Sequence, residues 1–312
     1  MRFYKICLVV LVALTMSSCS IEASDDLSSG NNQPLDNNSL SSNQEKHAHQ
    51  ALTGAIVPQQ YLWANEGMTV SLLDIGLEKL LVRKKSEGYP DALSEYQLSA
   101  YILSDYRYSE PARHDSYLAV ETMEGVLVYD LGDSSLDDFL YLCDVDDDGV
   151  DEVIVQQTID MSGGAGQHLS RIFRIVEGEI REIFSSYVPD PSGTGEKVFD
   201  TGFISEFLNG YKLRIDNTFT GYSTVVDISK RYTNEFFDEN GKGRSTIGIW
   251  CDSFWGFIPE DVDGDGIFEI ACQQYVSLTT HADGIGTAKS ILKFNPQTQE
   301  FEVVQAEFVT GK

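Results

Sequence analysis

Two short acidic stretches contain the residues of this sequence whose types and spacing favour metal chemistry. They are Asp144–Glu152 and Asp261–Glu269, and both read D-V-D-x-D-G-[V/I]-x-E. Alternating carboxylates, together with the main-chain carbonyl at position 7, supply the oxygen ligands that calcium prefers. The pattern therefore predicts two calcium sites. Their predicted ligands are Asp144, Asp146, Asp148, Val150 and Glu152 in the first stretch, and Asp261, Asp263, Asp265, Ile267 and Glu269 in the second.

The spacing excludes an EF-hand. An EF-hand loop carries a bidentate Glu at its twelfth position, where this sequence has Val155 and Cys272. Short apolar runs, typical of buried strands, follow both acidic stretches, so each loop is expected to lead directly into a strand. Gly149 and Gly266, at position 6, permit a sharp turn because glycine has no Cβ to clash at positive φ.

The repeated pattern resembles the calcium loops of FG-GAP and VCBS repeats. Those repeats occur in β-propeller-like and other all-β extracellular proteins, so the resemblance implies structural calcium in an all-β extracytoplasmic protein. It covers about nine residues in each copy. The alternative is a pair of solvated acidic turns that bind no ion. Such turns leave the repeated spacing unexplained, and crowded carboxylates repel one another unless a cation intervenes.

The charge and the first residues indicate where the protein works. A formal net charge of −27 excludes a nucleic-acid partner, which needs a basic surface. Arg2 and Lys5 precede the apolar run Ile6–Met16, and Ser17-Ser18-Cys19 follows. This arrangement resembles a bacterial lipobox, which implies cleavage before Cys19 and a lipid on that residue. The alternative is an ordinary secretory signal with an incidental cysteine.

The N-terminal part divides into three expected segments. Residues 1–18 are a predicted lipoprotein signal peptide, and residues 19–50, polar and without aromatic residues, are a predicted disordered tether. The predicted location is the cell envelope, outside the cytoplasm, with membrane attachment through the lipid on Cys19. Residues 51–97 are expected to form a helical element, because apolar residues recur at helical spacing in 69–87. The stretch 92–106 fits a helix or a strand.

From residue 98 onward the sequence predicts a duplicated antiparallel β module, residues 98–187 and 198–312, joined by the Pro-, Ser- and Gly-rich stretch 187–197. An apolar hairpin precedes each acidic stretch, and strands of alternating polarity follow it. The expected strands are 117–122, 125–131, 153–157, 170–175 and 179–184, then 211–216, 222–228, 270–274, 289–294 and 300–304. The predicted fold is all-β and β-propeller-like, with a β-sandwich as the alternative.

Motifs for catalysis are missing from the sequence. It has no G-x-S-x-G elbow, Walker loop or H-E-x-x-H, and the three cysteines after Cys19 are no disulfide framework. We therefore expect a non-enzymatic envelope lipoprotein with two structural calcium ions that binds a protein or a glycan. The alternative is an exported hydrolase of envelope polymers with structural calcium. Exposed Trp250 or Trp255 beside clustered acids in one cleft would favour it.

Overall fold

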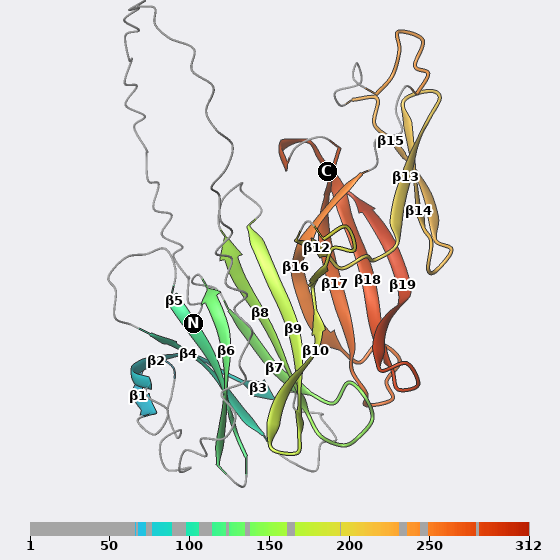
Figure 1. Cartoon of the computed structure of the whole chain (residues 1–312). Coiled ribbons are helices and arrows are strands. Elements are labelled where there is room, and N and C mark those ends of the chain that lie inside the picture. The colour runs from blue at the N-terminus through green and yellow to red at the C-terminus, as the bar shows by residue number, and fades with distance from the viewer. Residues whose placement is uncertain are drawn as a thin grey trace, which may run out of the picture. The chain divides into compact units, whose positions relative to one another are not determined.

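The computed structural model describes residues 66, 68–72, 77–88, 98–105, 114–122, 125–134, 138–160, 166–193, 195–230, 236–243, 249–278 and 281–311. Strands make up nearly all of the regular structure in this part of the chain, with a short 3₁₀ turn at His281–Asp283 (Figure 1). The all-β prediction is confirmed. The predicted signal peptide, the tether and Cys19 lie outside the described residues.

The prediction of a helix over residues 69–87 is wrong. Strands β1 (Thr69–Leu72) and β2 (Leu77–Lys85) pair antiparallel there, with Val70 opposite Leu80. A helix would have carried Gly76 in its interior, at a cost of about 1 kcal/mol relative to alanine. As a strand, β2 pairs along its length with β4 (Ser99–Asp105), which satisfies its backbone groups. Pairing between distant segments therefore outweighed the helical spacing.

The first sheet has the strand order β1-β2-β4-β5-β6. Its last two strands, β5 (His114–Glu121) and β6 (Val126–Ser134), form the hairpin that the sequence predicted at 117–131. The part of the ambiguous stretch 92–106 that is described, β4, is a strand.

Two further sheets each contain an acidic loop. One runs β10-β9-β8-β7-β3 and the other β16-β17-β18-β19. In the first of these, β3 (Glu87–Gly88) is parallel to β7 and the other neighbours are antiparallel. The bounds are β7 (Phe139–Cys143), β8 (Glu152–Asp160), β9 (Gln167–Val176), β10 (Glu179–Ser185), β16 (Trp250–Glu260), β17 (Glu269–Ser277), β18 (Gly284–Asn295) and β19 (Glu300–Thr310).

The meanders β7–β10 and β16–β19 share one register. Arg174 lies opposite Arg181 in the first, and Lys293 lies opposite Glu302 in the second. Both final hairpins also hold an extra residue at the same place: the pairing skips Ile183 in one and Val304 in the other. Because a β-bulge is a specific local feature, its repetition makes Arg174 and Lys293 equivalent positions.

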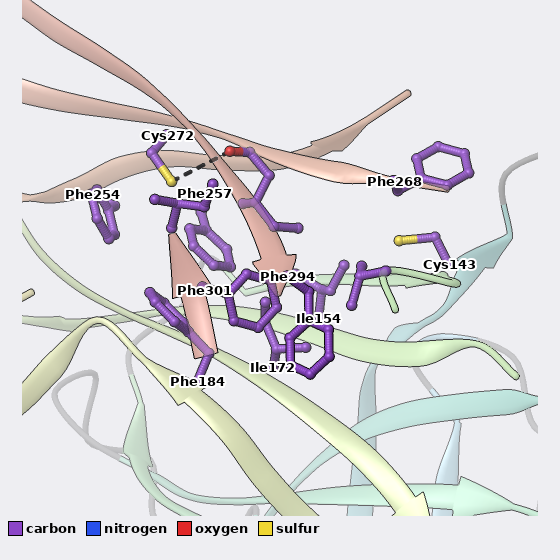
Figure 2. Packing of buried hydrophobic residues seen from close by; sticks show 13 residues of the cluster. Cys143, Ile154, Ile172, Phe184, Phe254, Phe257, Phe268, Cys272, Phe294 and Phe301 are labelled. Carbon is purple, nitrogen blue, oxygen red and sulfur yellow. Dashed lines mark hydrogen bonds between the residues drawn. The ribbon is translucent and has the colours of Figure 1, made fainter. Parts of the chain in front are cut away.

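The two meanders pack face to face through a core rich in phenylalanine (Figure 2). Phe184 of β10 stacks on Phe257 of β16 and meets the ring edge of Phe301 of β19. The opposite face of sheet β7–β10 packs on the first sheet, so that Ile154 and Val155, adjacent in β8, belong to different cores. A strand buried on both faces has no polar face, which explains its continuous apolar sequence.

Face-to-face packing is common to both predicted arrangements, because neighbouring blades of a propeller and the two sheets of a sandwich each pack in this way. None of the sheets formed by described residues is closed. The all-β antiparallel class is shown, and the choice between a propeller-like arrangement and a sandwich stays a prediction.

A smaller sheet of β13 (Phe203–Leu208), β14 (Lys212–Asn217) and β15 (Ser223–Asp227) packs with the part of sheet β16–β19 remote from the acidic loop. Its hairpin β14–β15 is the second one predicted from the sequence. The predicted joint at 187–197 contains a short hairpin, β11 (Tyr187–Pro189) with β12 (Glu196–Val198).

Candidate metal centre

The first acidic loop connects β7 to β8 and is organised by one carboxylate. Oδ1 of Asp144 accepts hydrogen bonds from the N–H groups of Asp146 (3.1 Å) and Asp147 (2.8 Å), and Oδ2 accepts from Gly149 (2.9 Å). The chain adopts left-handed backbone at Asp147 (φ 65°) and at Gly149 (φ 80°). The predicted turn at position 6 is therefore confirmed, and position 4 needs the same backbone conformation.

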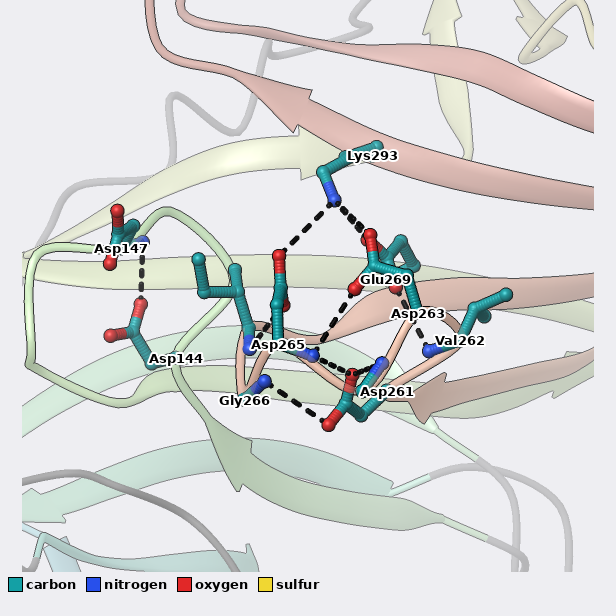
Figure 3. A network of polar contacts seen from close by, with 11 residues as sticks. Asp144, Asp147, Asp261, Val262, Asp263, Asp265, Gly266, Glu269 and Lys293 are labelled. Atoms are coloured by element: carbon teal, nitrogen blue, oxygen red, sulfur yellow. Dashed lines mark hydrogen bonds and ion pairs between the residues drawn. The ribbon is translucent and has the colours of Figure 1, made fainter.

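The second loop connects β16 to β17 and repeats this arrangement (Figure 3). Oδ1 of Asp261 accepts from the N–H groups of Gly264 (2.7 Å) and Asp265 (3.1 Å), and Oδ2 accepts from Gly266 (3.2 Å). Both left-handed positions are glycines here, with φ values of 76° and 89°. The second loop thus adopts the turn without placing a side chain at a left-handed position.

Three carboxylates converge in each loop. Ligand oxygens within 4.8 Å of one another come from Asp144, Asp146 and Glu152 in the first loop, and from Asp261, Asp263 and Asp265 in the second. Carboxylates this close favour a cation between them. Calcium takes about 6–8 oxygen ligands at about 2.3–2.6 Å from a flexible site. The donor set is therefore of the right chemistry for calcium in both loops.

The other predicted ligands lie in the loops but outside these clusters. They are Asp148, Val150, Ile267 and Glu269. The N–H of Val150 donates to Asp148 (2.8 Å), and the N–H of Ile267 donates to Asp265 (2.9 Å). The role of the main-chain carbonyls of Val150 and Ile267 as calcium ligands stays a prediction.

The glutamates at position 9 have a structural role that the spacing did not reveal. Glu152 is fully buried and Glu269 is 3% exposed. Oε2 of each accepts a hydrogen bond from the N–H at position 2 of its own loop, Val145 (3.0 Å) and Val262 (3.1 Å). Position 9 therefore closes the loop on its own beginning and leaves its second oxygen for a cation.

In each loop this second oxygen is contacted by a basic side chain from the third strand of the meander. Arg174 of β9 pairs with Glu152 (Nε to Oε1, 3.2 Å) and with Asp146. Lys293 of β18, its equivalent, pairs with Glu269 (Nζ to Oε1, 2.5 Å) and, at 3.1 Å, with Asp263 (Figure 3). Sequence reasoning missed both residues. The sequence does contain a signal for both: each is a basic residue at the same position of the strand of alternating polarity that follows its loop.

The titration behaviour of the loops follows from burial and pairing. Burial raises the pKa of Glu152 to about 8, and the neighbouring aspartates contribute in the same direction. In the exposed second loop, the hydrogen bond from Lys293 lowers the pKa of Asp263. Pairing with Glu269 correspondingly raises the pKa of Lys293.

The two loops adjoin. The N–H of Phe268, at position 8 of the second loop, donates a 2.9 Å hydrogen bond to the carbonyl oxygen of Asp144, at position 1 of the first. The ring of Phe268 belongs to the same core as Val145. The loops differ in surroundings, however: Val145 is 1% exposed, whereas Val262 at the same position of the second loop is 37% exposed. The first loop is therefore the more buried of the two, and the second is peripheral.

Of the remaining candidate residues, Cys143 directly precedes the first loop and packs in the same core as Val145 and Phe268. Cys143, Cys251 and Cys272 are free cysteines, and burial raises the pKa of each thiol. Trp250 and Trp255 are about half exposed on β16. Within the described residues there is no helix with the length and apolar character needed to span a bilayer.

Comparison with known proteins connects this chain to an uncharacterised relative. Residues 202–309, which include the second acidic loop, match the family model described as the YybI C-terminal domain. The chain is 25% identical over 161 residues to "Uncharacterized protein YybI" of Bacillus subtilis (strain 168). That match covers 51% of this chain and 58% of the relative, so the chain spans less than two thirds of the relative's length. No solved structure matches the chain.

Proposed function

We propose that this protein is a calcium-stabilised lipoprotein of the bacterial cell envelope that binds a partner and catalyses no reaction. The observation that carries the calcium assignment is the convergence of three carboxylates in each of two equivalent loops. The burial of Glu152 beside Asp144 and Asp146 adds to it, because a divalent ion would offset the cost of placing a charged carboxylate there. The two ions would be structural, since each loop joins two strands of a core sheet.

The calcium assignment is tested by thermal unfolding. Extracellular modules bind calcium at roughly 10⁻⁴–10⁻³ M. At ten times the dissociation constant each site would contribute about 1.4 kcal/mol. The melting temperature should therefore fall on chelation and recover with calcium but not with magnesium. Alanine at Asp261 and Asp263 should remove one site and leave the other. A melting curve that is the same with and without chelator would contradict the assignment.

The envelope location rests on the sequence of the first residues. Arg2, Lys5, the apolar run and Ser17-Ser18-Cys19 support export and lipidation at Cys19, and the polar segment 19–50 would hold the folded part away from the membrane. Mass spectrometry of the N-terminal peptide should show a diacylglyceryl cysteine. The Cys19→Ala variant should move from the membrane fraction to the soluble fraction, and its retention in the membrane would contradict lipid anchoring.

The partner would bind the outer face of sheet β16–β19. In the first meander, one row of side chains crosses the four strands and packs in the core between the meanders. This row is Tyr141, Ile154, Ile172 and Phe184. The same row in the second meander is Ile258, Ala271, Ile291 and Gln305. It is accessible: Ile258 is 43% exposed, and nearby Trp255 and Val304 are similarly open. A mixed apolar and polar face is the composition of reversible protein interfaces.

Binding can be measured with probes from the envelope itself. Purified cell walls and detergent-solubilised envelope proteins would each be tested for co-sedimentation or capture in calcium buffer, which separates a glycan from a protein partner. The Trp255→Ala and Ile258→Ser variants should lose binding. Val225→Ser, which changes an exposed residue of the separate sheet β13–β15, is the control. Equal binding by all three variants would contradict the proposed face.

A further inference from the structure

Lys293 lies among the carboxylates of the second loop, where a bound metal ion would otherwise neutralise their charge. Its Nζ lies 3.1 Å from Oδ2 of Asp263, 3.9 Å from Oδ2 of Asp265 and 2.5 Å from Oε1 of Glu269. These are positions 3, 5 and 9 of the loop. One ammonium therefore contacts three of the carboxylates that the spacing predicts as calcium ligands.

An ammonium and a calcium ion cannot share these oxygens. Calcium would bind them at about 2.3–2.6 Å, and two cations a few ångströms apart repel strongly where solvent is partly excluded. Calcium binding at the second loop therefore requires the Lys293 side chain to leave. That movement is feasible because the side chain is 36% exposed and ends a flexible four-carbon stem.

Arg174 holds the equivalent place in the first loop but is fixed there. Its guanidinium carbon lies 5.0 Å from the ring centroid of Phe294, which belongs to the other meander. The side chain is only 15% exposed and is shared between Asp146 and Glu152. A planar guanidinium that stacks on a ring and pairs with two carboxylates is held at several points. Its departure would leave the fully buried Glu152 without its basic partner.

We propose that Lys293 is a tethered counterion that calcium readily displaces from the second loop, whereas Arg174, at the equivalent place in the first loop, is held more firmly and yields its carboxylates less readily. The inference rests on the calcium binding proposed above. It means that the second loop keeps its conformation without metal, because Lys293 neutralises part of its charge, and that this same contact weakens calcium binding there. The peripheral loop is therefore the one where metal and side chain exchange more readily.

The test is calcium titration by calorimetry on the full-length chain in detergent, stripped of metal, with wild-type protein and Lys293→Met. Methionine keeps the length of the side chain and removes the charge. The variant should bind calcium about tenfold more tightly at one of its two sites, within the range of typical coupling between competing groups. Its melting temperature should fall below that of the wild type without metal and equal it at saturating calcium.

Two variants make the result specific. Lys289→Met removes a charge from the same strand, four residues away and opposite Glu307, and should change neither affinity. Arg174→Met should lower the melting temperature with and without calcium, because it also loses the contact with Phe294, and should leave the affinity of the second site unchanged. Calcium binding that is unchanged or weaker in Lys293→Met would overturn the proposal and leave the calcium sites standing. Failure of every variant and of the wild type to bind calcium would overturn both.

Discussion

The side-chain amide of Gln156 donates a 2.7 Å hydrogen bond from Nε2 to the main-chain carbonyl oxygen of Phe254 in β16. Gln274 donates in the same way, at 2.8 Å, to the carbonyl of Asp252. The pairing of β16 with β17 is irregular on both sides of Phe254, and a bulge leaves main-chain groups without a sheet partner. Gln156 therefore satisfies a buried carbonyl of the other meander, and Gln274 satisfies one within its own meander.

We expect Gln156→Leu to lower the free energy of unfolding by about 1–3 kcal/mol, because it keeps the volume and leaves a buried carbonyl without its donor. Gln273→Leu is the matched control. It occupies the equivalent position of the second meander, where the side chain is partly exposed, and its effect should stay within about 0.5 kcal/mol. Urea unfolding of both variants measures the difference. Equal effects would show that the hydrogen bond to Phe254 contributes nothing specific.

The left-handed backbone at position 4 predicts opposite effects in the two loops. Asp147→Gly should stabilise the protein by roughly 0.5–1 kcal/mol, since glycine adopts the φ of 65° without a Cβ penalty. Gly264→Asp should destabilise it by a similar amount. A Cβ at Gly264 would meet no atom within 4 Å, so the substitution creates no steric clash. Denaturant midpoints in saturating calcium provide the measurement, and a neutral Gly264→Asp would refute the argument.

The raised pKa of Glu152 predicts how stability changes with pH in metal-free protein. Its folded pKa of about 8 lies above the ordinary value of 4.5. Between these values the unfolded chain releases a proton that the folded protein retains, so the free energy of unfolding falls as pH rises. Glu152→Gln still accepts from the N–H of Val145 and should flatten this slope. Thermal unfolding from pH 5 to pH 8 in chelator would reveal it, and a wild-type slope no steeper than that of the variant would argue against a raised pKa.

The hydrogen bond between Phe268 and Asp144 predicts that the two sites are coupled. Asp261→Ala removes the acceptor that organises the second loop. The loosened loop should hold Phe268 less well, and calcium affinity at the first site should fall about fivefold, at the low end of typical couplings. Glu300→Ala, an exposed carboxylate at the start of β19, controls for the lost charge. Titration of the first site in both variants checks this, and equal affinities would mean that the sites act independently.

Local spacing in the sequence was sufficient to locate the acidic loops, the strands after them and the hairpins before them. Loops of this kind are organised by a carboxylate, such as that of Asp144, acting on N–H groups a few residues away, and strands show their period within a few residues. The same reasoning failed at Val70–Leu81, where apolar residues fit a helix and a strand. Pairing of β2 with β1 and with β4, which lies more than ten residues further along the chain, selected the strands.

The tertiary structure alone decided which cation each loop contacts and which loop is the more buried. Arg174 and Lys293 reach the carboxylates across the sheet, so their role depends on strand register and bulges that no local pattern specifies. Val145 and Val262 occupy the same position of the same motif, yet the first is buried by the second meander and the second is not. The sequence by itself determined two similar loops. Packing one meander on the other made them different, because an interface between sheets depends on contacts between residues far apart in the chain.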